Sequence, residues 1–93
     1  MPFITLTTDM GLKDYYVSSI KGNIITQLPE ATIIDITHDV KPWDILQASF
    51  ILKNAYANFP PGTVHIVGVD TELGKDRNHI ALKYDGHFFV GTD

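Results

Sequence analysis

Aspartates follow three apolar runs of this sequence at the points where strands would end. The three segments are Thr7-Thr8-Asp9, Thr37-His38-Asp39 and Val69-Asp70. A carboxylate accepts two hydrogen bonds, which suits the vicinal hydroxyls of a ribose, and it also attracts a cation. If the three segments meet in space, they form a polar rim that could bind a sugar or a positively charged group.

The apolar runs before these segments are predicted to be strands that alternate with helices. Runs rich in β-branched residues indicate strands, apolar residues at three- and four-residue steps indicate helices, and Asp85-Gly86 is a typical hairpin turn. The predicted elements, grouped by type, are strands 3–7, 32–37 and 63–69, helices 15–28 and 45–55, and a hairpin of strands 79–84 and 87–90.

The order β-α-β-α-β-β-β predicts an α/β fold, with a mostly parallel sheet flanked by helices and a C-terminal antiparallel hairpin. Ligands of such sheets bind outside the carboxyl ends of the parallel strands, where the three acidic segments would lie. The apolar third strand is expected to be covered on both faces, and the apolar second helix to be buried. Asp14 is a plausible N-cap of the first helix, and Asp44 with Gln47 has capping-box spacing at the second.

Composition excludes several classes of function. The 93 residues carry a net charge of −4 with scattered basic residues, which gives no reason to expect a nucleic-acid partner. The absence of cysteine excludes disulfides and thiolate metal sites. The start of the chain does not resemble a signal peptide and no apolar stretch is long enough for a membrane span, so a cytoplasmic protein without membrane partners is expected. The sequence has no glycine-rich phosphate loop and no nucleophile elbow.

Several side chains near the rim have both a chemical and a structural interpretation. Trp43 could stack on a flat base or a cation, or act as a hydrophobic staple at the helix start. Arg77 lies seven residues after Asp70 and could pair with it, either within a site or as a surface ion pair. Asp9 could be only a turn residue and Asp39 only a solvated loop residue. Their expected convergence is the stronger signal.

The other histidines are interpreted structurally. His65 alternates within the third strand and is expected to be a packing residue, whereas His79 and His87 flank the hairpin and are expected at the surface. No pair of histidines has the spacing of a helical zinc site. The histidines therefore do not identify a site of their own.

A family resemblance rests on four segments taken together, which are TTDMGLKDYYV, IIDITHDVKPWDI, FPPGTVHIVGVD and FFVGTD. Their order and spacing resemble the N-terminal domain of the S-adenosylmethionine (SAM) hydroxide adenosyltransferases, the SAM hydrolases related to the fluorinase and chlorinase enzymes. The resemblance covers essentially the whole chain. It implies that hydroxide attacks the ribose C5′ of SAM and that adenosine and methionine are released. SAM is then the substrate, and no metal or other cofactor is expected.

The resemblance also implies roles for particular residues. The implied substrate-binding residues are Asp9, Thr8, Trp43 and Asp14. Asp9 would bind the ribose hydroxyls, and Trp43 would line the ribose and methionine pocket. Asp70 and Arg77 would orient and deprotonate the attacking water. For Asp14, a helix cap is the alternative interpretation.

Departures from the family pattern limit what these 93 residues can do. Residues 70–74 read DTELG, where the family usually has DPGVG, and the retained Asp70 favours hydrolysis because the halogenases lack an acid there. The family's third water-activating residue, a later histidine, has no counterpart here, and neither has its β-rich second domain. We therefore expect residues 1–93 to be a single α/β domain, the N-terminal part of a longer two-domain protein. That protein would be a homotrimer with sites shared between subunits, and the 93 residues alone would have little activity.

Two other functions remain open from the sequence. A divalent-metal hydrolase could use Asp9, His38, Asp39 and Asp70, because carboxylates and imidazole together bind such ions. A non-catalytic nucleoside-binding module could keep the polar rim without activating water. Both alternatives place the site at the same edge of the sheet as the SAM hydrolase does.

Overall fold

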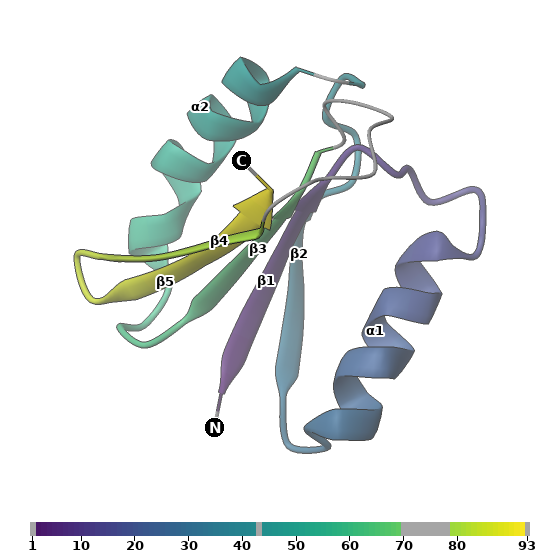
Figure 1. The fold of residues 1–93 in the computed structure, drawn as a ribbon, viewed down its shortest axis with the longest axis horizontal. Helices are drawn as coiled ribbons and strands as arrows, with labels where there is room; N and C mark the ends of the chain where they lie inside the picture. Colours follow the sequence, from purple (N-terminus) through teal and green to yellow (C-terminus); the bar gives the residue numbers. More distant parts are fainter. Residues whose placement is uncertain (1, 43, 70–78, 93) are drawn as a thin grey trace.

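The computed structural model describes residues 2–42, 44–69 and 79–92, and Figure 1 shows its fold. Five strands and two α-helices alternate as the sequence predicts. The elements in chain order are β1 (Phe3–Thr8), α1 (Tyr16–Gln27), β2 (Thr32–Thr37), α2 (Ile45–Ala55), the 3-10 turn η1 (Tyr56–Asn58), β3 (Val64–Gly68), β4 (His79–Tyr84) and β5 (His87–Thr92). Each predicted strand and helix is confirmed to within two residues, and β1 and β5 run slightly further than expected.

The strands form one sheet in the order β2-β1-β3-β5-β4. Strand β1 is parallel to β2 and to β3, β3 is parallel to β5, and β4 is antiparallel to β5. Asp85 and Gly86 both have positive φ angles, of 53° and 78°, as the primed turns that close tight hairpins require. The predicted fold class, a mostly parallel α/β sheet with a C-terminal antiparallel hairpin, is confirmed.

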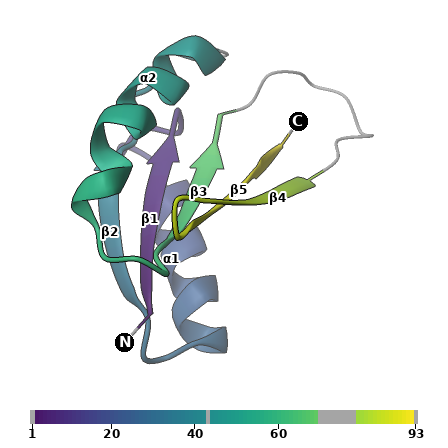
Figure 2. The same ribbon diagram turned by 90° about the vertical axis from the view of Figure 1, so that its left-hand side faces the viewer.

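The two helices lie on opposite sides of the sheet (Figure 1, and turned by 90° in Figure 2). This follows from two right-handed crossovers that run in opposite directions along the sheet, the first from β1 to β2 through α1 and the second from β2 past β1 to β3 through α2. Ala48 of α2 packs into a buried cluster with Val40 and Val69, which come from the loops after β2 and β3. Neither helix in the described ranges is long and apolar enough to cross a membrane.

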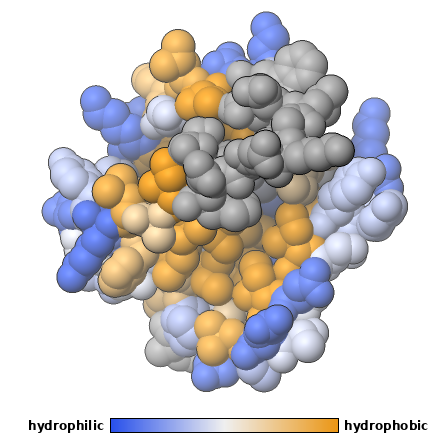
Figure 3. Space-filling model, in the orientation of Figure 1, coloured by the Kyte–Doolittle hydropathy of each residue, from blue (hydrophilic) through white to orange (hydrophobic). Residues whose placement is uncertain are grey.

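The helices leave more apolar surface exposed than the sequence suggests. Helix α2 buries only Ala48, while Leu46 is 83% exposed and Phe50 is 68% exposed. Strand β3 is only partly buried at Val64 and Ile66, so its predicted cover on both faces is wrong. Figure 3 shows hydrophobic side chains gathered across the sheet between α1 and the β4–β5 hairpin. A single helix on each face is too narrow to cover a sheet of five strands.

One of the two predicted helix caps is confirmed. The Asp44 carboxylate accepts a hydrogen bond from the Gln47 N–H at 2.9 Å at the start of α2. The Asp14 carboxylate accepts from the N–H of the adjacent Tyr15, also at 2.9 Å. Tyr15 is the N-cap residue of α1 and makes no side-chain cap. The prediction that Asp14 caps the first helix is therefore wrong.

A buried polar chain crosses the sheet beneath α2. The Thr5 hydroxyl lies 2.7 Å from Nδ1 of His65, and Nε2 of His65 lies 3.1 Å from Nδ1 of His87. Both rings are almost fully buried, and Tyr56 and Phe89 pack against them. The structural role predicted for His65 is confirmed. The surface position predicted for His87 is wrong, because its ring pairs with His65 inside the sheet layer.

Removing the Asp44 cap should weaken the fold measurably. Asp44→Ala leaves the N–H of Gln47 without its acceptor, and loss of such a cap costs about 1 kcal/mol of unfolding free energy. Asp14→Ala is the matched control, because this carboxylate caps no helix, and it should change the unfolding free energy by less than about half as much. Urea unfolding of both variants checks this, and equal losses would contradict it.

Acidification should destabilise the fold through His65. Burial, and then the nearby His87, lower the pKa of His65 to about 4 from its usual 6.5. The unfolded chain therefore takes up this proton at a higher pH than the folded chain does. The unfolding free energy should fall as the pH drops through this window, by about 1.4 kcal/mol per unit at most. Urea unfolding across this range checks the loss. The loss of unfolding free energy should be smaller in His65→Gln, because glutamine cannot titrate. The same pH profile in both proteins would contradict the attribution of the loss to His65.

Candidate functional site

The carboxyl ends of the parallel strands meet at one edge of the sheet. In β1, Thr7 is paired with Thr37 of β2, and Thr8 is paired with Gly68 of β3. The loops that follow are tied together by the backbone: the N–H of Gly11 donates to the His38 carbonyl at 2.7 Å, and the N–H of Val40 donates to the Thr8 carbonyl at 3.2 Å. The predicted convergence of the first two polar segments is confirmed.

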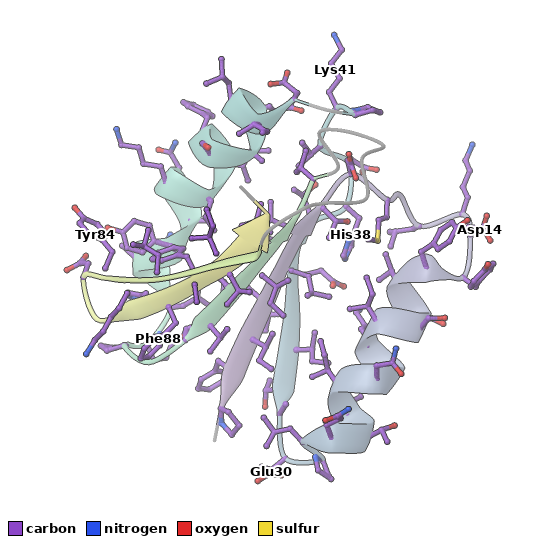
Figure 4. The ribbon with its side chains drawn as sticks, viewed as in Figure 1. Asp14, Glu30, His38, Lys41, Tyr84 and Phe88 are labelled. Atoms are coloured by element: carbon purple, nitrogen blue, oxygen red, sulfur yellow. The ribbon has the colours of Figure 1, made fainter. Side chains whose placement is uncertain are left out.

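Four side chains form a line of hydrogen bonds behind this edge. The Thr8 hydroxyl lies 2.7 Å from Nδ1 of His38, whose Nε2 lies 2.8 Å from the Asp35 carboxylate. The second oxygen of Asp35 accepts from the Lys21 ammonium at 2.7 Å. Figure 4 shows His38 beneath the loops that follow β1 and β2. The line therefore joins α1, β2 and the end of β1.

The side chains of this line are more exposed at its outer end than at Thr8, and the two outer ones are the oppositely charged Asp35 and Lys21. Thr8 and His38 are 1% and 4% exposed, whereas the Asp35 and Lys21 side chains are about one-third exposed, at 38% and 33%. Burial raises the pKa of Asp35, but hydrogen bonds and charge from Lys21 and His38 outweigh this effect and lower the pKa below its usual value. Asp35 is therefore a carboxylate at neutral pH, and it can act only as an acceptor.

Thr7 is the other polar residue buried at this edge. Its side chain is fully buried, and its hydroxyl has no hydrogen-bond partner within the described ranges. The hydroxyl of its neighbour Thr37, in β2, does have a partner, because it accepts a hydrogen bond from the Asp39 N–H at 3.1 Å. Buried hydroxyls normally have a partner, so Thr7 is an exception among the described residues at this end of β1.

The structure separates the predicted substrate-binding residues. The Thr8 hydroxyl is buried and engaged with His38 and with the Met10 N–H, which donates to it at 3.2 Å. Asp9 follows it at the strand end and is partly buried. Asp14 is exposed at the outer end of the loop before α1, away from His38 (Figure 4). Asp9 and Thr8 thus lie at the common edge, and Asp14 does not.

Three predicted site residues lie outside the described residues. They are Trp43, Asp70 and Arg77. Their assignment as pocket wall and water-activating pair stays a prediction. Val69, the described residue before Asp70, is buried against Val40 and Ala48 at the same edge as Thr8.

Sequence reasoning missed the contribution of Asp35 and Lys21. They lie 14 residues apart, on different elements, so no local spacing rule connects them. The usable signal was Asp35 itself, a single charge within the β-branched run TIIDIT. A charge within such an apolar run marks a position where the strand turns a polar side chain out of the core, here toward Lys21 and His38.

The metal-site hypothesis gains no support from the described part of the chain. No three acidic or imidazole side chains gather there in a way that could hold an ion. Both ring nitrogens of His38 are already engaged, one with Thr8 and one with Asp35. His38 could bind an ion only by giving up one of these partners. Asp70, the fourth proposed ligand, lies outside the described residues.

Comparison with known proteins identifies relatives across the whole chain. A (R)-S-adenosyl-L-methionine hydrolase from Methanocaldococcus jannaschii is 38% identical over 100% of this chain and 37% of its own length. A fluorinase from Nocardia brasiliensis is 30% identical over 88% of this chain and 27% of its own length. The chain therefore spans only 27% to 37% of the length of these relatives.

A solved structure has the same fold. An uncharacterised conserved protein from Thermotoga maritima superposes with a TM-score of 0.90 and 42% identity, over 96% of this chain and 35% of that one. The family profile for the SAM hydroxide adenosyltransferase N-terminal domain matches residues 4–93. This match and the relatives show that the chain belongs to the SAM hydroxide adenosyltransferase family, as an N-terminal domain.

Proposed function

We propose that this protein hydrolyses SAM. A water molecule attacks the ribose C5′ of SAM, the bond from C5′ to the sulfonium sulfur breaks, and its electron pair goes to the sulfur. The products are adenosine, methionine and a proton. The substrate already carries a positively charged sulfonium leaving group, so the reaction needs an oriented water molecule and a group that accepts its proton, and it needs no redox step.

The observation that carries this proposal is the meeting of the first two strand ends at one hydrogen-bonded edge. There Asp9 follows Thr8, and the loop after β2 is bonded to the residues on either side of Asp9. A carboxylate held in this way suits the two hydroxyls of a ribose. The positive sulfonium also favours binding next to a carboxylate. The relative named as a SAM hydrolase, at 38% identity, and the family match support the same substrate.

Hydrolysis is favoured over halide transfer by the retained acid at position 70. The hydrolase is 38% identical to this chain and the fluorinase 30%. On this proposal Asp70 accepts the proton of the attacking water, and Arg77 fixes the carboxylate and stabilises the developing charge. Trp43 lines the pocket for the ribose and methionine. No metal or other cofactor takes part.

We further propose that the 93 residues supply part of a larger site. The remaining groups would come from the rest of the longer protein, which would supply a histidine further along the chain that completes the water-activating set and, beyond it, a β-rich second domain that holds the adenine of SAM. This domain would belong to a neighbouring subunit of a homotrimer in the cytoplasm. The 93 residues alone would then have little or no activity toward SAM.

Substituting Arg77 tests the proposed chemistry in the natural-length protein. Arg77→Ala removes the charge that orients Asp70, so kcat should fall by roughly a hundredfold or more while SAM binding changes little. Calorimetric titration with SAM and the rate of adenosine release measure the two quantities. Reaction in ¹⁸O-labelled water should place the label on the adenosine 5′-hydroxyl.

Two controls separate the alternatives. EDTA should leave the rate unchanged, and loss of activity that added metal restores would instead favour a metal hydrolase. Wild-type protein that binds SAM or adenosine without turnover would indicate a nucleoside-binding module. Equal loss of binding and turnover in Arg77→Ala would contradict the role assigned to Arg77.

A further inference from the structure

The buried ring of His38 contacts Thr8, the residue before Asp9. Its Nδ1 lies 2.7 Å from the Thr8 hydroxyl, and that hydroxyl also accepts from the Met10 N–H at 3.2 Å. Thr8 and Met10 are the direct neighbours of Asp9 in the chain. One side-chain oxygen, held by His38, therefore fixes the residues before and after this carboxylate.

The backbone of the same histidine holds the next residue of the loop. The His38 carbonyl accepts from the Gly11 N–H at 2.7 Å. Gly11 has a φ of 71°, a left-handed conformation that suits glycine and turns its N–H back toward β2. His38 thus contacts the loop through its ring at Thr8 and through its carbonyl at Gly11. Asp9 lies between these two attachment points.

The chemistry of Asp35 fixes the direction of its hydrogen bond with His38. Asp35 is a carboxylate and only accepts, so Nε2 of His38 carries the proton that it shares with Asp35. The Thr8 hydroxyl accepts from the Met10 N–H and can either donate to Nδ1 of His38 or accept from it, because a hydroxyl has one hydrogen and two lone pairs. Both ring nitrogens of His38 are therefore engaged, Nε2 with Asp35 and Nδ1 with Thr8. Lys21 holds the far oxygen of Asp35 at 2.7 Å and so fixes the outer end.

We propose that His38 is a positioning residue for Asp9, through the hydroxyl of Thr8. The inference rests on the proposed function, in which Asp9 binds the ribose hydroxyls of SAM. His38, backed by Asp35 and Lys21, sets the orientation of the turn that presents Asp9. His38 is not the base that activates water, because both of its nitrogens are engaged and its ring is buried.

Two substitutions of His38 test its two ring contacts separately. His38→Asn keeps a polar atom near the place of Nδ1 and can retain the contact to Thr8. His38→Gln keeps one near the place of Nε2, can retain the contact to Asp35 and loses the contact to Thr8. If positioning of Asp9 is the role of His38, only the glutamine variant should disturb recognition of the ribose.

The readout is discrimination between SAM and its 2′-deoxyribose analogue in the natural-length protein. The ratio of kcat/KM for the two substrates should fall by roughly tenfold in His38→Gln, which corresponds to about one lost hydrogen bond, and by less than about twofold in His38→Asn. In an Asp9→Ala background, His38→Gln should cause no further loss of discrimination. A merely structural effect would lower the rates for both substrates equally.

His65→Gln is the matched control. His65 is equally buried and also contacts a β1 threonine, because its Nδ1 lies 2.7 Å from the Thr5 hydroxyl. It lies in β3 and contacts β1 through Thr5, on the face of the sheet opposite to Thr8 and His38. His65→Gln should lower stability and leave the discrimination ratio unchanged. A ratio that falls as much in His65→Gln as in His38→Gln would overturn the proposal.

Amide hydrogen exchange at Met10 and Gly11 tests the inference without any substrate. Exchange at these two amides should speed up in His38→Gln and remain slow in His38→Asn. Unchanged exchange and unchanged discrimination in His38→Gln would overturn the role of His38. Wild-type protein that neither binds nor cleaves SAM would instead overturn the proposed function, and the exchange result would still decide whether His38 holds the turn.

Discussion

The position of β1 between β2 and β3, parallel to both, is the constraint on which the rest of the structure depends. It brings the ends of three chain segments to one edge, because Thr7 is paired with Thr37 and Thr8 with Gly68. The side chains of one strand alternate between the two faces, so a shift of β1 by one residue would turn Thr8 away from His38. The pairing register therefore decides which polar groups meet and where Asp9 emerges.

Threonines on β1 join the two layers of the molecule through histidines. Thr5 contacts His65 on the face of α2, and Thr8 contacts His38 on the face of α1. His65 gives the buried Thr5 hydroxyl its partner, and His38 gives the buried Thr8 hydroxyl a second partner beside the Met10 N–H. The first contact lies within an aromatic cluster and stabilises the fold. The second continues to Asp35 and Lys21 at the surface and holds the loops of the candidate site.

Much of the fold was predictable because it depends on local patterns. The β-branched runs, the helical periodicity and Asp85-Gly86 each determine the structure of their own segment, and the structure confirms them. The cap at Asp14 was wrong because the sequence cannot show whether a helix begins at the next residue or one later. The buried position of His87 was missed because it depends on a partner, His65, in another strand.

The sequence predicts at which edge of the sheet the candidate site lies, but not which side chains meet there. The order of elements places the first two polar segments together, and this is confirmed by the bonds between residues 8–11 and 38–40. The line through Asp35 and Lys21 joins residues 14 positions apart, and only the packing of α1 beside β2 brings them together. The position of Trp43, Asp70 and Arg77 stays a prediction.

A crystal structure of the natural-length protein with adenosine bound tests the central claim most directly. The account predicts that both ribose hydroxyls lie within hydrogen-bond distance of the Asp9 carboxylate, at the carboxyl end of β1. Adenosine bound elsewhere, such as in the groove between α2 and the hairpin that Tyr56, Tyr84 and Phe89 line, would contradict it.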